Sequence, residues 1–284
     1  MSTSSPSSTS SSSPAFALAL GGGGARGLAH IIVLDALDEL GIHTSLISGS
    51  SIGAIIGTCY AGGMSARDIR AFFLDLASHK TTIASTLVSA RVGRLRDIST
   101  LGNPFLFDGQ RLLDKFWPTD LARTFEDLQI PLKVVTTDFF DAKTVVFDAG
   151  PLLAPVAASM SIPGVFEPVI INGRCLTDGG ITNPVPFDIL DTSDPVIAVD
   201  VVGSVTANGD RSPTGFEILS GTIQVMLNTI TREKLKQNPP EIFVRPPVQP
   251  LPIMNFLKVK EILAHCEPIK DDVKRQIETI IFGR

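Results

Sequence analysis

Several kinds of residue are scarce in this 284-residue chain. Its three cysteines, Cys59, Cys175 and Cys266, include no C-x-x-C pair, which disfavours a disulfide scaffold or a structural zinc site and makes a reducing compartment the default. Lys and Arg number 24 against 29 Asp and Glu, so no basic excess is present to bind nucleic acid. A single Trp and a single Tyr argue against base-stacking platforms and aromatic sugar clefts. No apolar run reaches about 18 residues, so no membrane-spanning helix is expected.

Apolar residues are plentiful by contrast, at 44% of the chain, while charged residues make up 19%. A chain of this length and composition suits one α/β domain, which we expect over residues 15–284. Residues 1–14 are rich in Ser, Thr and Pro and carry no charged side chain, which predicts a disordered tail. The apolar run Ala15–Leu20 is short for an export signal and no Lys or Arg precedes it, so a cytoplasmic location is expected.

From residue 15 onward, segments with strand-like and helix-like patterns alternate. Asn172-Gly173 is a strong two-residue turn signal and predicts a hairpin over 169–177. The other expected strands are 15–20, 46–47, 132–137, 144–147 and 196–202. The expected helices are 28–40, 52–61, 66–77, 216–236 and 268–282. This alternation predicts a three-layer α/β/α fold with a mainly parallel central sheet.

A glycine-rich segment, Gly21–Gly27, separates the first expected strand from the first expected helix. It fits the G-x-G-x-x-G spacing of a dinucleotide fingerprint, but the next strand lacks the acid that would bind the ribose. A phosphate loop is excluded because Leu28 and Ala29 stand where Lys and Ser or Thr are required. Consecutive glycines can instead direct their backbone N–H groups at one point, as an oxyanion hole requires. At this stage a tight strand-to-helix turn without any chemistry explains the segment equally well.

The segment Gly49–Gly53 fits G-x-S-x-G, the nucleophile elbow, with Ser51 at its centre. Glycines two positions to either side allow the sharp turn that presents such a serine, although Ser51 could simply cap the following helix. A serine nucleophile also needs a base. The only late histidine, His265, lies in a helical-looking stretch far from any glycine turn, so a Ser-His-Asp triad has little support.

Asp178 ends the second strand of the predicted hairpin and is followed by two glycines, so the chain can turn closely around its carboxylate. An Asp-Gly turn is common by itself. The three motifs together, Gly22–Gly27, Gly49–Gly53 and Asp178–Gly180, resemble the ordered pattern of patatin-like phospholipases, especially the bacterial members related to neuropathy target esterase. The resemblance extends over about residues 15–202.

This resemblance implies a patatin-like fold and a catalytic Ser-Asp dyad, in which Ser51 attacks an acyl carbonyl and Asp178 takes its proton. It also implies that the backbone amides of Gly22, Gly23 and Gly24 hold the oxyanion. The supporting positions within the motifs are Arg26, Gly49, Gly53 and Gly179.

Aspartate is a weak base unless burial raises its pKa, so we expect Asp178 to be shielded from water. A weak base suits esters better than amides, because alcohols leave more easily than amines. No cofactor and no metal are expected, since Asp138, Asp141 and Asp148 show no ligand spacing with His or Cys. For Arg26, fixation of the glycine loop is the simpler alternative to a role in the chemistry.

The resemblance implies a fatty-acyl ester as substrate, such as a phospholipid or a lysophospholipid. Transient contact with a membrane surface is expected, with 101–107 and 246–256 as candidate patches and apolar packing under a loop as the alternative. The irregular stretch 80–107 is interpreted either as a cover over the site or as an ordinary surface connection. A catalytically idle protein that binds a lipid or a partner is the competing hypothesis, and the oligomeric state is left open.

Overall fold

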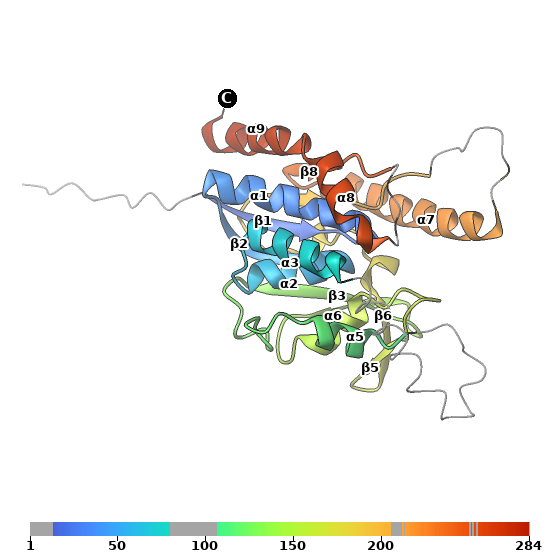
Figure 1. The fold of residues 1–284 in the computed structure, drawn as a ribbon. Coiled ribbons are helices and arrows are strands. Elements are labelled where there is room, and N and C mark those ends of the chain that lie inside the picture. The colour runs from blue at the N-terminus through green and yellow to red at the C-terminus, as the bar shows by residue number, and fades with distance from the viewer. Residues whose placement is uncertain are drawn as a thin grey trace, which may run out of the picture.

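The computed structural model describes residues 14–79, 107–205, 212, 214–249, 251, 253 and 255–283 (Figure 1). The expected tail over 1–14 lies outside the described residues except for residue 14. The irregular stretch 80–107 and the candidate patch 101–107 also lie outside them up to residue 106. No helix within the described ranges combines the length and the apolar character needed to cross a bilayer.

The centre of the molecule is a sheet in the order β5-β6-β3-β2-β1-β7-β8, with β4 paired to β3. Strands β8, β7, β1, β2 and β3 run parallel, whereas β4, β5 and β6 join antiparallel. The strands are β1 (Ala15–Leu20), β2 (His43–Ser50), β3 (Leu132–Asp138), β4 (Lys143–Phe147), β5 (Val169–Ile171), β6 (Arg174–Asp178), β7 (Val196–Val199) and β8 (Ile242–Val244). The mainly parallel sheet is therefore confirmed, with an antiparallel flank at one side.

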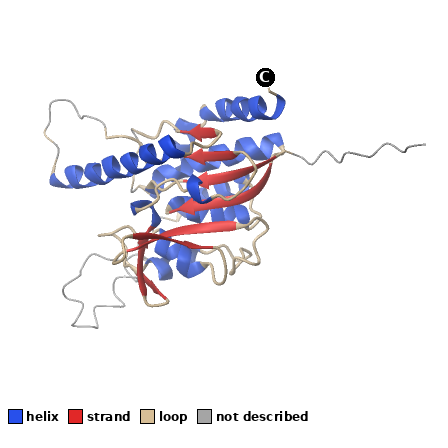
Figure 2. Cartoon of the chain, turned by 180° about the vertical axis from the view of Figure 1, so that it is seen from behind, coloured by secondary structure: helices blue, strands red, loops and turns tan. Residues whose placement is uncertain are grey.

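Helices cover the sheet unequally. The α-helices are α1 (His30–Leu40), α2 (Ile52–Ala61), α3 (Ala66–Ser78), α5 (Gly109–Phe116), α6 (Leu153–Ser159), α7 (Gly215–Gln237), α8 (Val259–Cys266) and α9 (Ile269–Phe282). The 3₁₀ helices are η1 (Gly24–Ala29), η3 (Gly179–Ile181), η4 (Phe187–Ile189) and η5 (Phe256–Lys258). One large apolar core joins the sheet to most of the helices. On the other face a small cluster includes Phe187 of η4 and Leu235 of α7, and Figure 2 shows the strands largely open from that side.

Local sequence signals explain several of these elements. The first expected strand and the helix over 52–61 have the predicted bounds. The chain turns at Asn172 and Gly173 with positive φ at both, as the Asn-Gly hairpin requires. The strand expected at 46–47 is longer, because β2 pairs with a neighbour on each side. The strand expected over 196–202 ends at Val199.

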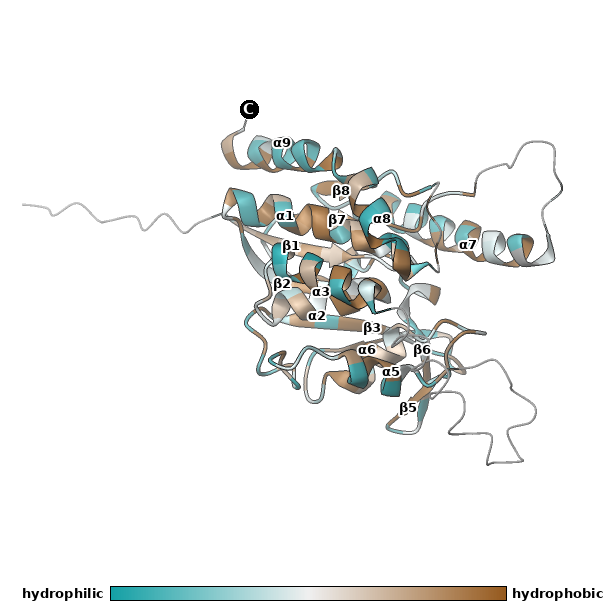
Figure 3. Cartoon of the chain, in the orientation of Figure 1, coloured by the Kyte–Doolittle hydropathy of each residue, from teal (hydrophilic) through white to brown (hydrophobic). Residues whose placement is uncertain are grey.

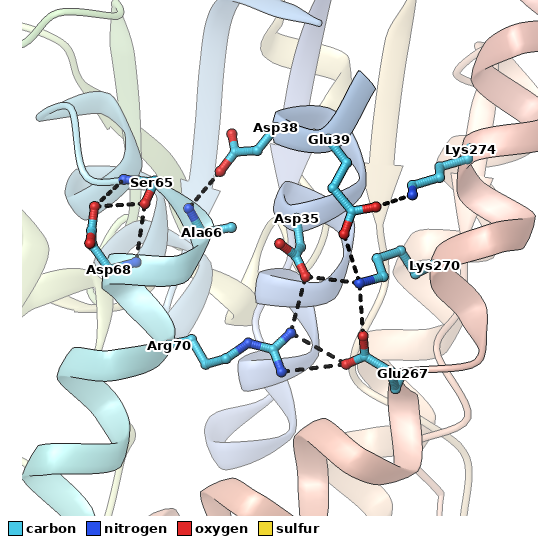
Figure 4. A network of polar contacts seen from close by, with 10 residues as sticks. All are labelled: Asp35, Asp38, Glu39, Ser65, Ala66, Asp68, Arg70, Glu267, Lys270 and Lys274. Carbon is cyan, nitrogen blue, oxygen red and sulfur yellow. Dashed lines mark hydrogen bonds and ion pairs between the residues drawn. The ribbon is translucent and has the colours of Figure 1, made fainter. Parts of the chain in front are cut away.

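A polar network ties the C-terminal helices to the body (Figure 4). Arg70 of α3 donates to Asp35 of α1 and to Glu267, at 3.2 and 3.3 Å. Lys270 of α9 reaches Asp35, Glu39 and Glu267 at 3.1, 3.0 and 2.9 Å. Lys274 of α9 also pairs with Glu39, so three cations share three carboxylates at the junction of α1, α3 and α9, which makes this more than an isolated surface pair.

Replacing the central cation should loosen this junction. We expect Lys270→Met to lower the free energy of unfolding by about 1 kcal/mol in dilute buffer, because the three carboxylates lose their shared partner. In about 1 M salt the difference should shrink, since the screening length falls to about 3 Å. Urea unfolding at both ionic strengths measures this effect. Lys236→Met, which breaks only an exposed pair with Glu233, is the control and should change stability by less than about 0.5 kcal/mol.

Candidate active site

Ser51 occupies the sharp turn between β2 and α2 with φ 55° and ψ −124°. A positive φ is uncommon for a residue with a Cβ atom, and such strain persists only where the surroundings hold it. A Cβ on Gly49 would lie 2.6 Å from the Cα of Ala54, and one on Gly53 would collide with the carbonyl of Leu20. Both flanking glycines are therefore required by close approach of the backbone, as the elbow motif predicts.

The side chains of Ser51 and Asp178 meet although 127 positions separate them in the chain. The hydroxyl of Ser51 donates to Oδ2 of Asp178 at 2.6 Å, while the N–H of Gly180 donates to Oδ1 at 2.7 Å. Asp178 is only 8% exposed, which confirms the predicted shielding from water. The sequence reasoning thus located two side chains that the fold brings into direct contact.

The antiparallel flank positions Asp178. This residue ends β6 opposite Thr136 of β3, and its N–H donates to the carbonyl of Ser161 at 3.1 Å. The hydroxyl of Thr137 donates to the Asp178 carbonyl at 2.9 Å. A Cβ on Gly179 would collide with the carbonyl of Val135, so glycine is needed directly after the acid.

Burial makes Asp178 a better base than an ordinary aspartate. Loss of hydration raises its pKa to about 6, and the hydrogen bonds from Ser51 and Gly180 oppose that rise because they stabilise the carboxylate. At neutral pH the carboxylate is therefore mostly ionised, yet its affinity for a proton is closer to the working range of a general base.

The glycine loop lies against the nucleophile. A Cβ on Gly22 would come within 3.2 Å of the Cβ of Ser51, so a larger residue would crowd the serine. The N–H of Gly22 donates to the carbonyl of Pro184 at 2.9 Å and is already engaged, which differs from the expectation that it faces the oxyanion. Within the described ranges, the N–H groups of Gly23 and Gly24 have no acceptor.

Arg26 holds neighbouring loops in place. Its guanidinium is buried and donates to the carbonyls of Val202, Leu251 and Gln249 at 2.6, 2.8 and 3.1 Å. Burial lowers its pKa from the ordinary value. These contacts match the loop-fixation interpretation, and they join Gln249 and Leu251 of the stretch 246–256 to the glycine loop, while Phe256 of the same stretch remains exposed.

Two further side chains support the site. His30 is fully buried, its Nε2 donates to the carbonyl of Gly21 at 2.8 Å, and burial lowers its pKa to about 4, so the ring is neutral. Ser159 accepts the N–H of Ser51 at 2.9 Å and donates to the carbonyl of Val135 at 2.6 Å. No sequence signal indicated a role in the site for either residue, because their contacts exist only in the folded chain.

An apolar cavity of about 350 Å³ opens beside Ser51. Side chains from α2, α3, α5 and α6 form much of its wall, among them Ile55, Phe72, Leu113 and Val156. Trp117 and Phe166, from the segments that follow α5 and α6, also line it. Among the described residues, no group of three or more His, Cys, Asp or Glu side chains is placed to hold a metal ion. The arrangement therefore combines a hydroxyl, a buried carboxylate and a space suited to a hydrocarbon chain.

Comparison with known proteins places this geometry in a family. The family model described as patatin-like phospholipase matches residues 18–191. An NTE family protein of Mycobacterium tuberculosis is 40% identical over 190 residues, which cover 66% of this chain and 49% of that protein. Lysophospholipase NTE1 of Candida glabrata is 30% identical over 271 residues, which cover 86% of this chain and 15% of that protein.

A human protein and a solved structure are also similar to this chain. Patatin-like phospholipase domain-containing protein 6 of Homo sapiens is 34% identical over 186 residues, covering 64% of this chain and 13% of that protein. The chain thus spans about half, or less, of the length of these curated relatives. The crystal structure of VipD from Legionella pneumophila shares the fold, with a TM-score of 0.54 and 15% identity over 94% of this chain and 67% of that one. Because the family model spans more than half of the sequence, the chain belongs to the patatin-like phospholipase family.

Proposed function

We propose that this protein is a serine esterase that cleaves fatty-acyl esters, such as phospholipids or lysophospholipids, through Ser51 and Asp178. The observation that carries the proposal is the 2.6 Å hydrogen bond between the Ser51 hydroxyl and the buried Asp178 carboxylate at the mouth of an apolar cavity. Membership of a phospholipase family supports lipid hydrolysis as the activity. The sheltered setting supports the carboxylate as base.

In the first half of the reaction, the Ser51 oxygen attacks the acyl carbonyl and Asp178 accepts the hydroxyl proton. The oxyanion that forms on the substrate would accept hydrogen bonds from the free N–H groups of Gly23 and Gly24, at the start of η1. Asp178 then returns the proton to the leaving alcohol, and an acyl-enzyme remains.

In the second half, water takes the place of the alcohol. Asp178 removes a proton from that water, which attacks the acyl-enzyme carbonyl, and the proton passes to the Ser51 oxygen as the fatty acid leaves. The amide of Gly22, bound to Pro184, would hold the loop in position throughout.

Substitution of Ser51 and of its neighbour Ser50 tests which serine acts as the nucleophile. Ser51→Ala should lower kcat for p-nitrophenyl butyrate by roughly a millionfold, because no other hydroxyl in the described part of the chain bonds to the Asp178 carboxylate. Ser50→Ala is the matched control, since it removes a buried hydroxyl one position earlier that has no partner, and it should remain active. A fluorophosphonate should label the Ser50→Ala protein and not the Ser51→Ala protein. Full activity in Ser51→Ala would overturn the proposal.

The raised pKa of Asp178 predicts how kcat/KM depends on pH. Only ionised Asp178 can accept the serine proton, and its pKa is raised to about 6. For p-nitrophenyl butyrate, kcat/KM should therefore fall as the pH drops through about 6 and level off above it. Asp178→Asn should remove this limb together with most of the activity. A flat profile from about pH 5 to 8 in the wild type would contradict Asp178 as the base.

The cavity predicts a dependence on acyl length. Leu113→Trp places a larger side chain in the cavity from α5, away from both members of the dyad. It should lower kcat/KM for p-nitrophenyl decanoate by about tenfold or more, because a long chain loses its space. Hydrolysis of p-nitrophenyl acetate is the control and should stay within about twofold. Equal losses on both esters would show that the cavity does not hold the acyl chain.

A further inference from the structure

The long helix α7 turns several polar side chains toward the protein. Gln224 is 9% exposed and Thr231 is 1% exposed, and both face inward. Asn228, between them along the same face, donates to the carbonyl of Gly203 at 2.7 Å. A surface helix normally turns its apolar stripe toward the core, as Leu235 does near the C-terminal end of α7, and the N-terminal half of the helix departs from this rule.

The opposite face of α7 is apolar and exposed. Five large side chains on it are 47–62% exposed: Ile218, Leu219, Ile223, Val225 and Met226. At about 100° per residue they span an arc of roughly 160°, centred away from Gln224 and Thr231. The first charged residue after Ile218 is Arg232. Brown bands along α7 in Figure 3 show the same apolar content.

This face lies at the edge of the sheet that carries the candidate active site. In Figures 1 and 2, α7 extends beyond the sheet on the side where the parallel strands end, and Ser51 follows the end of β2 on that side. Phe139 and Phe140, in the turn that follows β3, are 57% and 80% exposed at the same edge. Two separate apolar features therefore project from the end of the molecule where substrate must enter.

A lipid surface fits this face better than a second copy of the chain. The uncharged segment 218–231 is about 21 Å long, and one helix of that length against its copy buries less than the roughly 1,200 Å² typical of a stable dimer. Insertion of apolar side chains into a lipid surface does not require the buried area that a stable protein dimer needs. The stretch between Glu217 and Arg232 carries no charged side chain, which suits insertion of its apolar side chains among headgroups.

We propose that α7 is an interfacial helix: its outward face, from Ile218 to Met226, enters the surface of a lipid aggregate and holds the Ser51 edge of the sheet against it. An effect of this contact on catalysis rests on the proposed hydrolysis of lipid esters. Binding of α7 to a lipid surface does not depend on that activity. This surface adds α7 to the segments 101–107 and 246–256 that the sequence suggests as lipid-contacting patches.

Vesicle flotation of the full chain carrying Ser51→Ala measures binding without turnover. On vesicles of phosphatidylcholine and phosphatidylserine, adding Leu219→Glu and Met226→Glu should reduce the bound fraction by roughly tenfold or more, since two inserted apolar side chains are lost. The matched control carries Ile280→Glu and Phe282→Glu on α9, which are 37% and 67% exposed and lie far from the site. It should bind like the parent.

Ester hydrolysis and vesicle binding, measured separately, distinguish a failure of the α7 proposal from a failure of the proposed esterase activity. With Ser51 restored, the α7 double variant should hydrolyse p-nitrophenyl butyrate at the wild-type rate and vesicle phospholipid at least about tenfold more slowly. No turnover of p-nitrophenyl butyrate by the wild type would refute the proposed esterase, while the flotation result would still decide the role of α7. The α7 proposal is overturned if the parent does not float, if the α9 control loses binding equally, or if light scattering shows a dimer that the α7 substitutions dissociate.

Discussion

The hydrogen bond between Ser51 and Asp178 joins two differently built parts of the sheet. Ser51 follows the parallel strand β2, whereas Asp178 ends the antiparallel strand β6, and β3 pairs with both. Ser50 lies opposite Val135, and Asp178 lies opposite Thr136. A slip of one residue in either register would turn a side chain to the other face of the sheet and separate the pair. The site therefore depends on the register of one central strand.

Backbone groups around the dyad are fixed by side chains from distant segments. Ser159 bridges the N–H of Ser51 and the carbonyl of Val135, so α6 links the elbow to β3. His30 fixes the carbonyl at the start of the glycine loop. The bond from Gly22 to Pro184 joins that loop to the chain just beyond Asp178. These contacts connect Ser51, Asp178 and the glycine loop, so displacement of one of them would disturb the other two.

The sequence predicted the elements whose signals are local. The buried run that forms β1, the helix opened by the serine elbow and the Asn-Gly hairpin all carry their pattern within a few residues. The missed elements are short: α6 has seven residues with a proline inside it, and β8 has three. Motifs identified Ser51 and Asp178, because close backbone approach demands particular glycines beside them. The engaged amide of Gly22 and the contacts of Ser159 could not be read in advance, since their partners are set by tertiary structure.

Burial of Asp178 also affects how the stability of the folded chain depends on pH. Because the folded-state pKa of Asp178 is raised to about 6, the native chain holds this proton more tightly than the unfolded chain does. The contribution of this group to folding is therefore fully present below about pH 4 and is lost as the pH rises through about 6. At neutral pH the deficit is on the order of 3 kcal/mol, a sizeable part of the net stability of a typical domain. A substitution that removes this buried acid should therefore stabilise the fold at neutral pH, whatever it does to activity.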